Sequence, residues 1–275
     1  MIEKEIRIKE LLHQSALRLR EVTDIPQKEA MILLAQHLGK GMSWLIAHSD
    51  DVIKEDAFFL EAINRRALHE PLEYIVGSAM FYGKLFEVDS RVLIPRPETE
   101  LLVDKAVALA KDLPQVHIVE IGCGSGIISI MLALLLPNAK ITAVDISKEA
   151  LHVSQKNAKI HGVSERINFV HGSYLDNVNE TIDMIVSNPP YIANDEPLAI
   201  GLSFEPSLAL YGGRKGDEML CCIIDLFMER NVKILACEMG YDQKNPLQVY
   251  ASKKGLKTHF YEDLAGLDRG FWIKE

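Results

Sequence analysis

The chain has 275 residues, of which 48% are hydrophobic and 25% charged, as expected for a globular protein of one large or two smaller domains. Its 30 Lys and Arg residues against 39 Asp and Glu residues give a formal net charge of -9, which disfavours a protein that grips nucleic acid phosphates by itself. The longest apolar run, residues 127–137, is too short to span a membrane.

Cysteine spacing and the first residues of the chain indicate the compartment. Cys123, Cys221, Cys222 and Cys237 form no C-x-x-C pair and have no histidines at zinc spacing, so we expect reduced thiols and no metal. The start of the chain, MIEKEIRIKELLHQ, mixes acids and bases and lacks the apolar core of a signal peptide. These features predict a cytoplasmic protein that does not associate with a membrane.

Residues 1–73 are predicted to form a small helical domain. Apolar residues recur at helical spacing over 6–19 and 30–38, where Gly39 and Gly41 are expected to end the second helix, and a third helical stretch covers 56–69. This region has no catalytic chemistry, so docking or folding is its expected role. Residues 74–95 are strand-like with glycines as turn formers, which predicts an extended or β-hairpin linker.

Residues 96–275 show the pattern of an α/β domain. A short helix is expected over 98–111, and strands then alternate with helices as far as the tail, which could add two edge strands. The expected strands before the tail are HIVEIG, KITAVD, INFVHG, IDMIVSN and KILACEMG. This alternation predicts a doubly wound, mostly parallel sheet with helices on both faces.

A glycine-rich loop connects the first strand of this domain to its helix. The loop consists of Gly122, Cys123, Gly124, Ser125 and Gly126. Glycine lets the backbone turn sharply and approach a ligand closely, and the helix N-terminus offers unpaired N–H groups. The dinucleotide fingerprint would need its third glycine at Ile127, so the loop disfavours NAD and FAD. Its G-x-G-x-G form resembles the loop of the S-adenosylmethionine-binding methyltransferases; a merely tight turn is the alternative.

Two further residues are candidates to bind the adenosine of such a cofactor. Asp145 ends the second strand, where a carboxylate can accept hydrogen bonds from both ribose hydroxyls. Its alternative role is a helix N-cap, although Ser147 can itself serve as that cap. Tyr174 follows the third strand and either stacks on the adenine or is an ordinary half-buried tyrosine.

The residues Asn188-Pro189-Pro190-Tyr191 follow the fourth strand and are predicted to be the catalytic group. In a doubly wound sheet this position lies in the ligand-binding crevice. An amide or aromatic amino nitrogen is a poor nucleophile because its lone pair is delocalised. If Asn188 Oδ1 and the Pro189 carbonyl each accept one N–H, the nitrogen is held toward the methyl donor and its growing positive charge meets oxygen dipoles. Tyr191 would pack on the flat face of the group.

Other segments distinguish between the enzymes that carry N-P-P-Y, which act either on adenine or cytosine amino groups or on glutamine. They are PLEYIVG at 71–77, VLIPRPETELLV at 92–103, FEPSLAL at 204–210 and EDLAGLDRG at 262–270. Together these segments closely resemble the peptide chain release factor glutamine methyltransferases, in the same order from about residue 70 to the C-terminus. The resemblance implies a class-I methyltransferase fold with an N-terminal docking domain, S-adenosyl-L-methionine as cofactor, and class-I release factors as substrates, methylated at the glutamine of their Gly-Gly-Gln loop.

The resemblance also implies roles for matching residues. Residues 122–126, Asp145 and Asn188 would contact S-adenosylmethionine, with Asn188 shared with the substrate. Pro97 and Thr99 belong to a segment that would close over the methionine end of the cofactor; a proline-led helix start is the alternative.

The chain departs from the family in two places. Ser173 stands where an acidic residue is common, next to the predicted adenine contact, and no glycine precedes KILACEMG. Glu205 and Asp268 match family motifs, but the sequence gives no chemical role for either.

Two other functions compete with this prediction. An adenine-N6 methyltransferase of DNA or RNA would need a basic surface and a flipped base, which the acidic composition and the lack of a target-recognition domain disfavour. A non-enzymatic scaffold with the same fold would be expected to have lost the glycine loop, Asp145 or N-P-P-Y, and all three are present.

Overall fold

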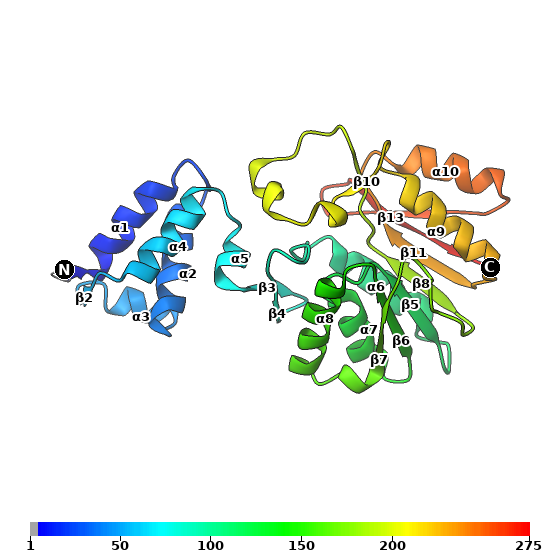
Figure 1. The fold of residues 1–275 in the computed structure, drawn as a ribbon, viewed down its shortest axis with the longest axis horizontal. Helices are drawn as coiled ribbons and strands as arrows, with labels where there is room; N and C mark the ends of the chain where they lie inside the picture. Colours follow the sequence, from blue (N-terminus) through cyan, green and yellow to red (C-terminus); the bar gives the residue numbers. More distant parts are fainter. Residues whose placement is uncertain (1–4) are drawn as a thin grey trace. The chain divides into compact units, whose positions relative to one another are not determined.

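The computed structural model describes residues 5–275 and divides into two compact units (Figure 1). The N-terminal unit comprises the described chain up to Gly77 together with Ala199–Phe204, and the second unit comprises Ser78–Leu198 and Glu205–Glu275. Among residues 5–275, no helix is both long enough and apolar enough to cross a bilayer.

The N-terminal unit is built from helices around one apolar core. Its elements are β1 (Glu5–Arg7), α1 (Ile8–Leu19), α2 (Pro26–Leu38), α3 (Met42–Ala47), β2 (Val52–Lys54), α4 (Ala57–Ala67) and α5 (Leu72–Val76). The three predicted helices are confirmed, whereas α3, α5 and the short antiparallel β1–β2 pair were not predicted. Helix α5 includes residues 74–76, which were expected to be extended. Gly39 ends α2 in the left-handed conformation, as expected, but Gly41 precedes α3 as its N-cap instead of ending a helix.

The second unit begins with a hairpin, β3 (Ser78–Phe81) and β4 (Lys84–Glu87), that joins the α/β domain. Its two-residue turn has positive φ at both Tyr82 (54°) and Gly83 (70°), the conformation that suits the twist of a tight hairpin. The carboxylate of Glu100 accepts a hydrogen bond from the Tyr82 amide at 2.6 Å and so supports the turn.

A seven-stranded sheet forms the centre of this unit, with the strand order β12-β13-β11-β8-β5-β6-β7. Its strands are β5 (His117–Ile121), β6 (Lys140–Asp145), β7 (Ile167–His171), β8 (Met184–Ser187), β11 (Ile234–Glu238), β12 (His259–Glu262) and β13 (Asp268–Lys274). All neighbours are parallel except at β13, which runs antiparallel to β11 and β12. The doubly wound, mostly parallel fold is therefore confirmed. In the tail, only β12 is an edge strand, since β13 lies between two partners.

Helices cover both faces of the sheet (Figure 1). The helices are α6 (Thr99–Ala110), α7 (Ile127–Leu135), α8 (Lys148–Ile160), α9 (Glu218–Glu229) and α10 (Lys244–Lys253). Alternate strand residues supply two cores: Ile118 packs with α6, α7 and α8, and its neighbour Val119 packs with α9 and α10. Helix α10 was not predicted, because only Leu247 and Ala251 of it are buried and it contains Pro246. That proline is tolerated because it lies in the first turn, where the missing N–H has no helical partner.

Short elements follow the predicted catalytic residues. They are β9 (Ile192–Ala193), which pairs in parallel with β10 (Tyr211–Gly213), and 3-10 turns at Ile200–Phe204 and Ser207–Ala209. Another 3-10 turn, Ser164–Arg166, lies earlier in the chain, just before β7. The β9–β10 pair returns the chain to the end of the sheet beside N-P-P-Y.

Candidate active site

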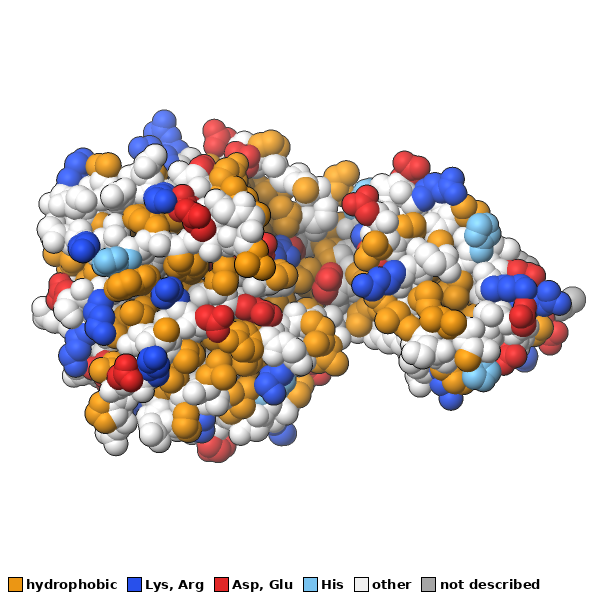
Figure 2. All heavy atoms as spheres, turned by 180° about the vertical axis from the view of Figure 1, so that it is seen from behind, with side chains coloured by type: hydrophobic (Ala, Val, Ile, Leu, Met, Phe, Trp, Pro, Cys, Tyr) orange, Lys and Arg blue, Asp and Glu red, His pale blue; other side chains and the backbone are white. Residues whose placement is uncertain are grey.

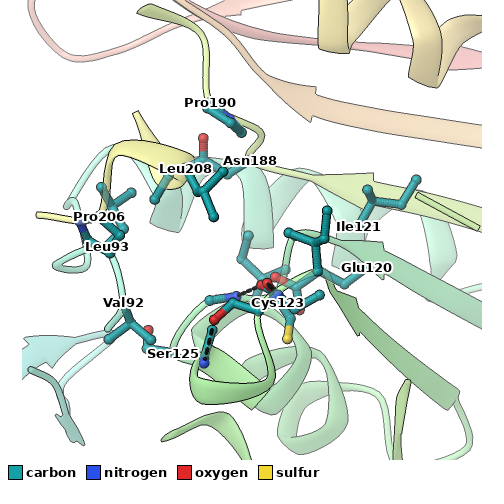
Figure 3. Close-up of a pocket in the computed structure, with 18 of the residues that line it drawn as sticks. Val92, Leu93, Glu120, Ile121, Cys123, Ser125, Asn188, Pro190, Pro206 and Leu208 are labelled. Carbon is teal, nitrogen blue, oxygen red and sulfur yellow. Dashed lines mark hydrogen bonds between the residues drawn. The ribbon is translucent and has the colours of Figure 1, made fainter. Parts of the chain in front are cut away.

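A cavity of about 190 Å³ lies at the carboxyl ends of β5, β6 and β8, where a doubly wound sheet binds its ligands. The glycine loop lines one side of it. Asn188 and Pro190 lie across the cavity from Cys123 and Ser125 (Figure 3). Residues 91–96 and the 206–209 turn complete the wall. The topology thus places both predicted motifs around one space.

The glycine loop is shaped by three left-handed residues, with φ of 74° at Gly122, 52° at Gly124 and 84° at Gly126. A Cβ added at Gly122 or Gly124 would meet no protein atom within 4 Å, which leaves space beside the loop for a ligand. At Gly126 the added Cβ would lie 2.2 Å from Ser154 Oγ, so this glycine allows α7 to pack against α8. Gly126 itself does not line the cavity.

The buried side chain of Asn157, on α8, fixes this loop from behind. Its Nδ2 donates to the Ser125 carbonyl at 2.9 Å and to the Glu87 carbonyl at 2.9 Å, while its Oδ1 accepts from the Glu87 amide at 2.7 Å. Asn157 therefore joins the glycine loop to the end of the β3–β4 hairpin. The sequence placed Asn157 in a helix but gave no sign of these contacts.

Asp145 lies at the cavity with a largely buried carboxylate. Its two oxygens accept from the amides of Gly124 and Ser147, each at 2.8 Å. Ser147 Oγ accepts from the Ala150 amide at 3.1 Å and caps α8, so Asp145 is not the N-cap. Burial raises the pKa of Asp145. A carboxylate has about four lone-pair positions, so Asp145 can still accept from a hydroxyl donor.

Tyr174 lies at the cavity in a half-buried position with a φ of 50°. Burial first, and then the neighbouring Cys222 thiol, raise the pKa of Tyr174 to about 12, so its hydroxyl stays protonated near neutral pH. Its ring packs against the core beneath α9. Stacking on adenine remains a prediction.

Asn188 is oriented by a hydrogen bond to the first turn of α6. Its Nδ2 donates to Thr99 Oγ1 at 3.2 Å, and this leaves Oδ1 as the atom that can accept from a ligand. Thr99 and Pro190 also line the cavity, whereas Pro97, Pro189 and Tyr191 do not. The sequence predicts Asn188 to be an acceptor, and in the structure its Nδ2 donor already has a hydrogen-bond partner.

The backbone that follows Asn188 is held by close contacts. A Cβ at Gly212 would lie 2.3 Å from the Pro190 carbonyl oxygen, and one at Gly216 would lie 2.3 Å from the Tyr191 carbonyl oxygen. Gln243 Nε2 donates to the same Tyr191 oxygen at 3.0 Å. Sequence reasoning missed these residues. The glycine-rich GGRKG at 212–216 was the available signal, since such clusters mark close backbone approach.

Glu205 joins two segments that line the cavity. Its buried carboxylate accepts from the Ile94 amide at 3.0 Å and forms an ion pair with the Arg96 guanidinium. Asp268, the other motif residue without an assigned role, pairs with Lys244 Nζ at 2.8 Å and does not line the cavity. The structure thus gives Glu205 a role in shaping the cavity wall and gives Asp268 an ion pair outside it.

A second carboxylate at the cavity, Glu120, was also missed by the sequence reasoning. It is fully buried and accepts from the Ser129 amide at 2.8 Å and from the Ser129 hydroxyl. Burial, with a smaller contribution from the charge of Asp145, raises the pKa of Glu120 to about 8. In the unfolded chain the pKa of a glutamate is about 4.3. The stability that this difference contributes is therefore present at acid pH and lost as the pH rises toward 8.

We expect Glu120→Gln to remove this pH dependence. The unfolding free energy of the wild type, minus that of the variant, should fall by roughly 2–4 kcal/mol between pH 5 and pH 9, because only the wild type must bury a charge at high pH. Urea unfolding at several pH values measures the difference. The exposed Glu165→Gln is the matched control and should show no such trend. An identical pH dependence in both variants would contradict the assignment.

Comparisons with known proteins show the family of the chain. The PrmC N-terminal domain family matches residues 10–77, and the Methyltransferase small domain family matches residues 98–202. A release factor glutamine methyltransferase of Buchnera aphidicola is 33% identical over 96% of this chain and 98% of its own length. A bifunctional methyltransferase of Rickettsia typhi is 32% identical over 95% of this chain, which spans only 56% of that relative.

A solved structure supports the fold. The N-terminal domain of human METTL16 in complex with SAH superposes with a TM-score of 0.52 at 18% identity, over 82% of this chain and 85% of that one. The same architecture is therefore present at a sequence identity too low to carry a function. From the family matches and the Buchnera relative, the chain belongs to the release factor glutamine methyltransferase family.

Proposed function

We propose that the chain transfers the methyl group of S-adenosylmethionine to the side-chain amide nitrogen (N5) of the glutamine in the Gly-Gly-Gln motif of class-I peptide chain release factors. The observation that carries the proposal is Asn188, whose Nδ2 is bound to Thr99 and whose Oδ1 is left to accept from an amide. Membership of the release factor glutamine methyltransferase family supports the choice of glutamine over a nucleobase.

The cavity suits S-adenosylmethionine. Gly122 and Gly124 leave open space along the loop, Asp145 offers a carboxylate to the ribose, and Tyr174 offers a ring near the expected position of the adenine. Thr99 lies toward Asn188 and would contact the methionine end. When bound, the cofactor supplies an electrophilic methyl group on a sulfonium, and the protein supplies orientation and electrostatics.

The chain's own residues would then position the acceptor. Asn188 Oδ1 and the Pro189 carbonyl each accept one N–H of the glutamine amide, which fixes the direction of its nitrogen. The same two oxygens stabilise the positive charge that develops on that nitrogen. Since the nitrogen becomes acidic as it is methylated, its proton can leave to solvent without a strong base. The buried backbone contacts of Pro190 and Tyr191 keep these acceptors in place.

Label transfer tests the proposal directly. The purified chain is incubated with radiolabelled S-adenosylmethionine and unmethylated release factor, and the label is located by mass spectrometry. We expect label only on the Gly-Gly-Gln glutamine, and none on a Gly-Gly-Ala release factor. Transfer to an adenine-containing oligonucleotide, with none to release factor, would contradict the proposed substrate while leaving the fold and the cofactor site intact.

We further propose that the N-terminal unit docks the release factor away from the reacting glutamine. This unit exposes large apolar side chains, of which Phe58 is the most exposed at 81% (Figure 2 shows such side chains in orange). Phe58→Glu is expected to raise KM for release factor about tenfold, the effect of losing one aromatic contact at an interface. Steady-state kinetics with whole release factor measure this.

The control for docking is Val249→Glu on α10, which also exposes an apolar side chain, at 54%, but in the other unit. It should leave KM unchanged, and both variants should bind S-adenosylmethionine as the wild type does. Equal KM values for Phe58→Glu and the wild type would rule out docking through this part of α4.

A further inference from the structure

Glu238 is the last residue of β11 and is buried beside the predicted catalytic residues. Because β11 pairs in parallel with β8, both strands end at the same edge of the sheet, and Asn188 follows β8 directly. Tyr191 donates its hydroxyl hydrogen to Glu238 Oε1 at 3.4 Å. The other oxygen, Oε2, is buried and has no hydrogen-bond partner among residues 5–275. A carboxylate in this setting is costly to bury, because one of its oxygens lacks a hydrogen-bond donor in the described part of the chain.

Thr99 connects the same carboxylate to Asn188. The Thr99 Oγ1 atom accepts from Asn188 Nδ2 at 3.2 Å, so its own hydrogen is free to point at another acceptor. The Thr99 side chain lies near enough to Glu238 to lower the pKa of that carboxyl group. Glu238 therefore accepts from the Tyr191 hydroxyl and lies near Thr99, the residue that is hydrogen-bonded to Asn188; Tyr191 and Asn188 are the two ends of N-P-P-Y.

The charge state of Glu238 follows from the groups around it. Burial, and the like charge of Glu98 at the start of α6, raise its pKa, whereas Arg269 on β13 and the Tyr191 hydroxyl lower it; the result is a pKa of about 7. Tyr261 on β12 also faces this carboxylate, which helps to raise the pKa of that phenol. Above pH 7 the ionised carboxylate accepts from the Tyr191 hydroxyl and attracts the hydroxyl hydrogen of nearby Thr99. Below pH 7 it carries a proton of its own and becomes a poorer acceptor.

We propose that Glu238 is a positioning residue for the acceptor amide, which holds Tyr191 directly and Asn188 through Thr99, so that Asn188 presents Oδ1 rather than Nδ2 to the substrate. The expected kinetic effects rest on the proposed function. The expected structural effect, a fixed orientation of the Asn188 amide, does not depend on the identity of the substrate.

The test compares Glu238→Gln, Glu238→Ala and Tyr191→Phe with the wild type. In the wild type, kcat should fall as the pH falls through about 7, since Glu238 loses its charge there. Glu238→Gln should lower kcat at pH 8 about 10-fold and flatten that pH profile, with Glu238→Ala lower still, while S-adenosylmethionine affinity changes less than about twofold. Because Tyr191 and Glu238 act as one unit, adding Tyr191→Phe to Glu238→Gln should cost less than the product of the single losses.

A second readout does not depend on activity. The Asn188 side-chain amide signals are assigned in a ¹H–¹⁵N spectrum by their loss in Asn188→Ala, and they should shift in Glu238→Gln. Unmoved signals together with a wild-type pH profile would overturn the proposal. A loss of S-adenosylmethionine binding equal to the loss of kcat would also overturn it, because Glu238 would then only stabilise the fold. If the wild type leaves release factor unmethylated while the Asn188 signals still shift, the proposed function fails and the positioning role stands.

Discussion

Asn188→Ala is expected to lower kcat for methylation of release factor by at least about 100-fold, the size of effect that one preorganised electrostatic contact has on a transition state. The reason is that the two ends of the Asn188 amide differ: Nδ2 donates to Thr99, and Oδ1 is free to accept from the glutamine nitrogen. Alanine removes the acceptor and leaves one N–H of the glutamine amide without its partner. Single-turnover kinetics at saturating cofactor measure the loss.

The matched control is Asn138→Ala, an exposed asparagine in the turn before β6, at the opposite end of that strand from the cavity. It should keep the wild-type kcat. A near-normal kcat in Asn188→Ala, with a raised KM only, would mean that Asn188 binds the ground state and the transition state equally. Such a result would contradict the role assigned to Oδ1.

Asp145→Ala should weaken S-adenosylmethionine binding about 100-fold, because two hydrogen bonds to a charged group are lost together. Calorimetric titration measures the affinity. Asp145→Asn is the intermediate control, since it keeps one acceptor oxygen without the charge and should bind more tightly than the alanine variant.

A deoxyribose analogue of the cofactor distinguishes a ribose contact from a general effect on the loop. Asp145 also accepts from the Gly124 amide at 2.8 Å, so its removal could disturb the loop itself. If the carboxylate binds the ribose, the analogue should bind the wild type more weakly than the natural cofactor, and this difference should shrink in Asp145→Ala. An equal penalty in both proteins would contradict ribose recognition by Asp145.

Much of the fold could be predicted because strong local signals agree with one another. The apolar runs HIVEI and KITAV bear residues for both cores, as buried parallel strands must, and the glycines mark the turns that follow them. Helix α10 escaped prediction because its apolar face is short and its first turn contains a proline. The β1–β2 pair escaped because each strand has only three residues.

The sequence likewise predicted one part of the candidate site and missed another. The cavity residues that the sequence predicted lie in contiguous motifs, in which residues close together in the chain are also close in space. Glu205 could not be assigned, because it bonds Ile94 and Arg96 across more than a hundred residues. Glu238 and Gln243 likewise reach N-P-P-Y from β11 and from the residue before α10. Such contacts depend on strand order, which a single sequence does not specify.

The position of Asn157 has a consequence for the precision of cofactor binding. Helix α8 is capped by Ser147, two residues after Asp145, and three turns later it holds the glycine loop through Asn157 and the Ser125 carbonyl. The Asp145 carboxylate, which we predict to bind the ribose, and the loop beside it are thus both attached to the same helix. A small displacement of α8 would therefore move Asp145 and the glycine loop together and leave the distance between them unchanged.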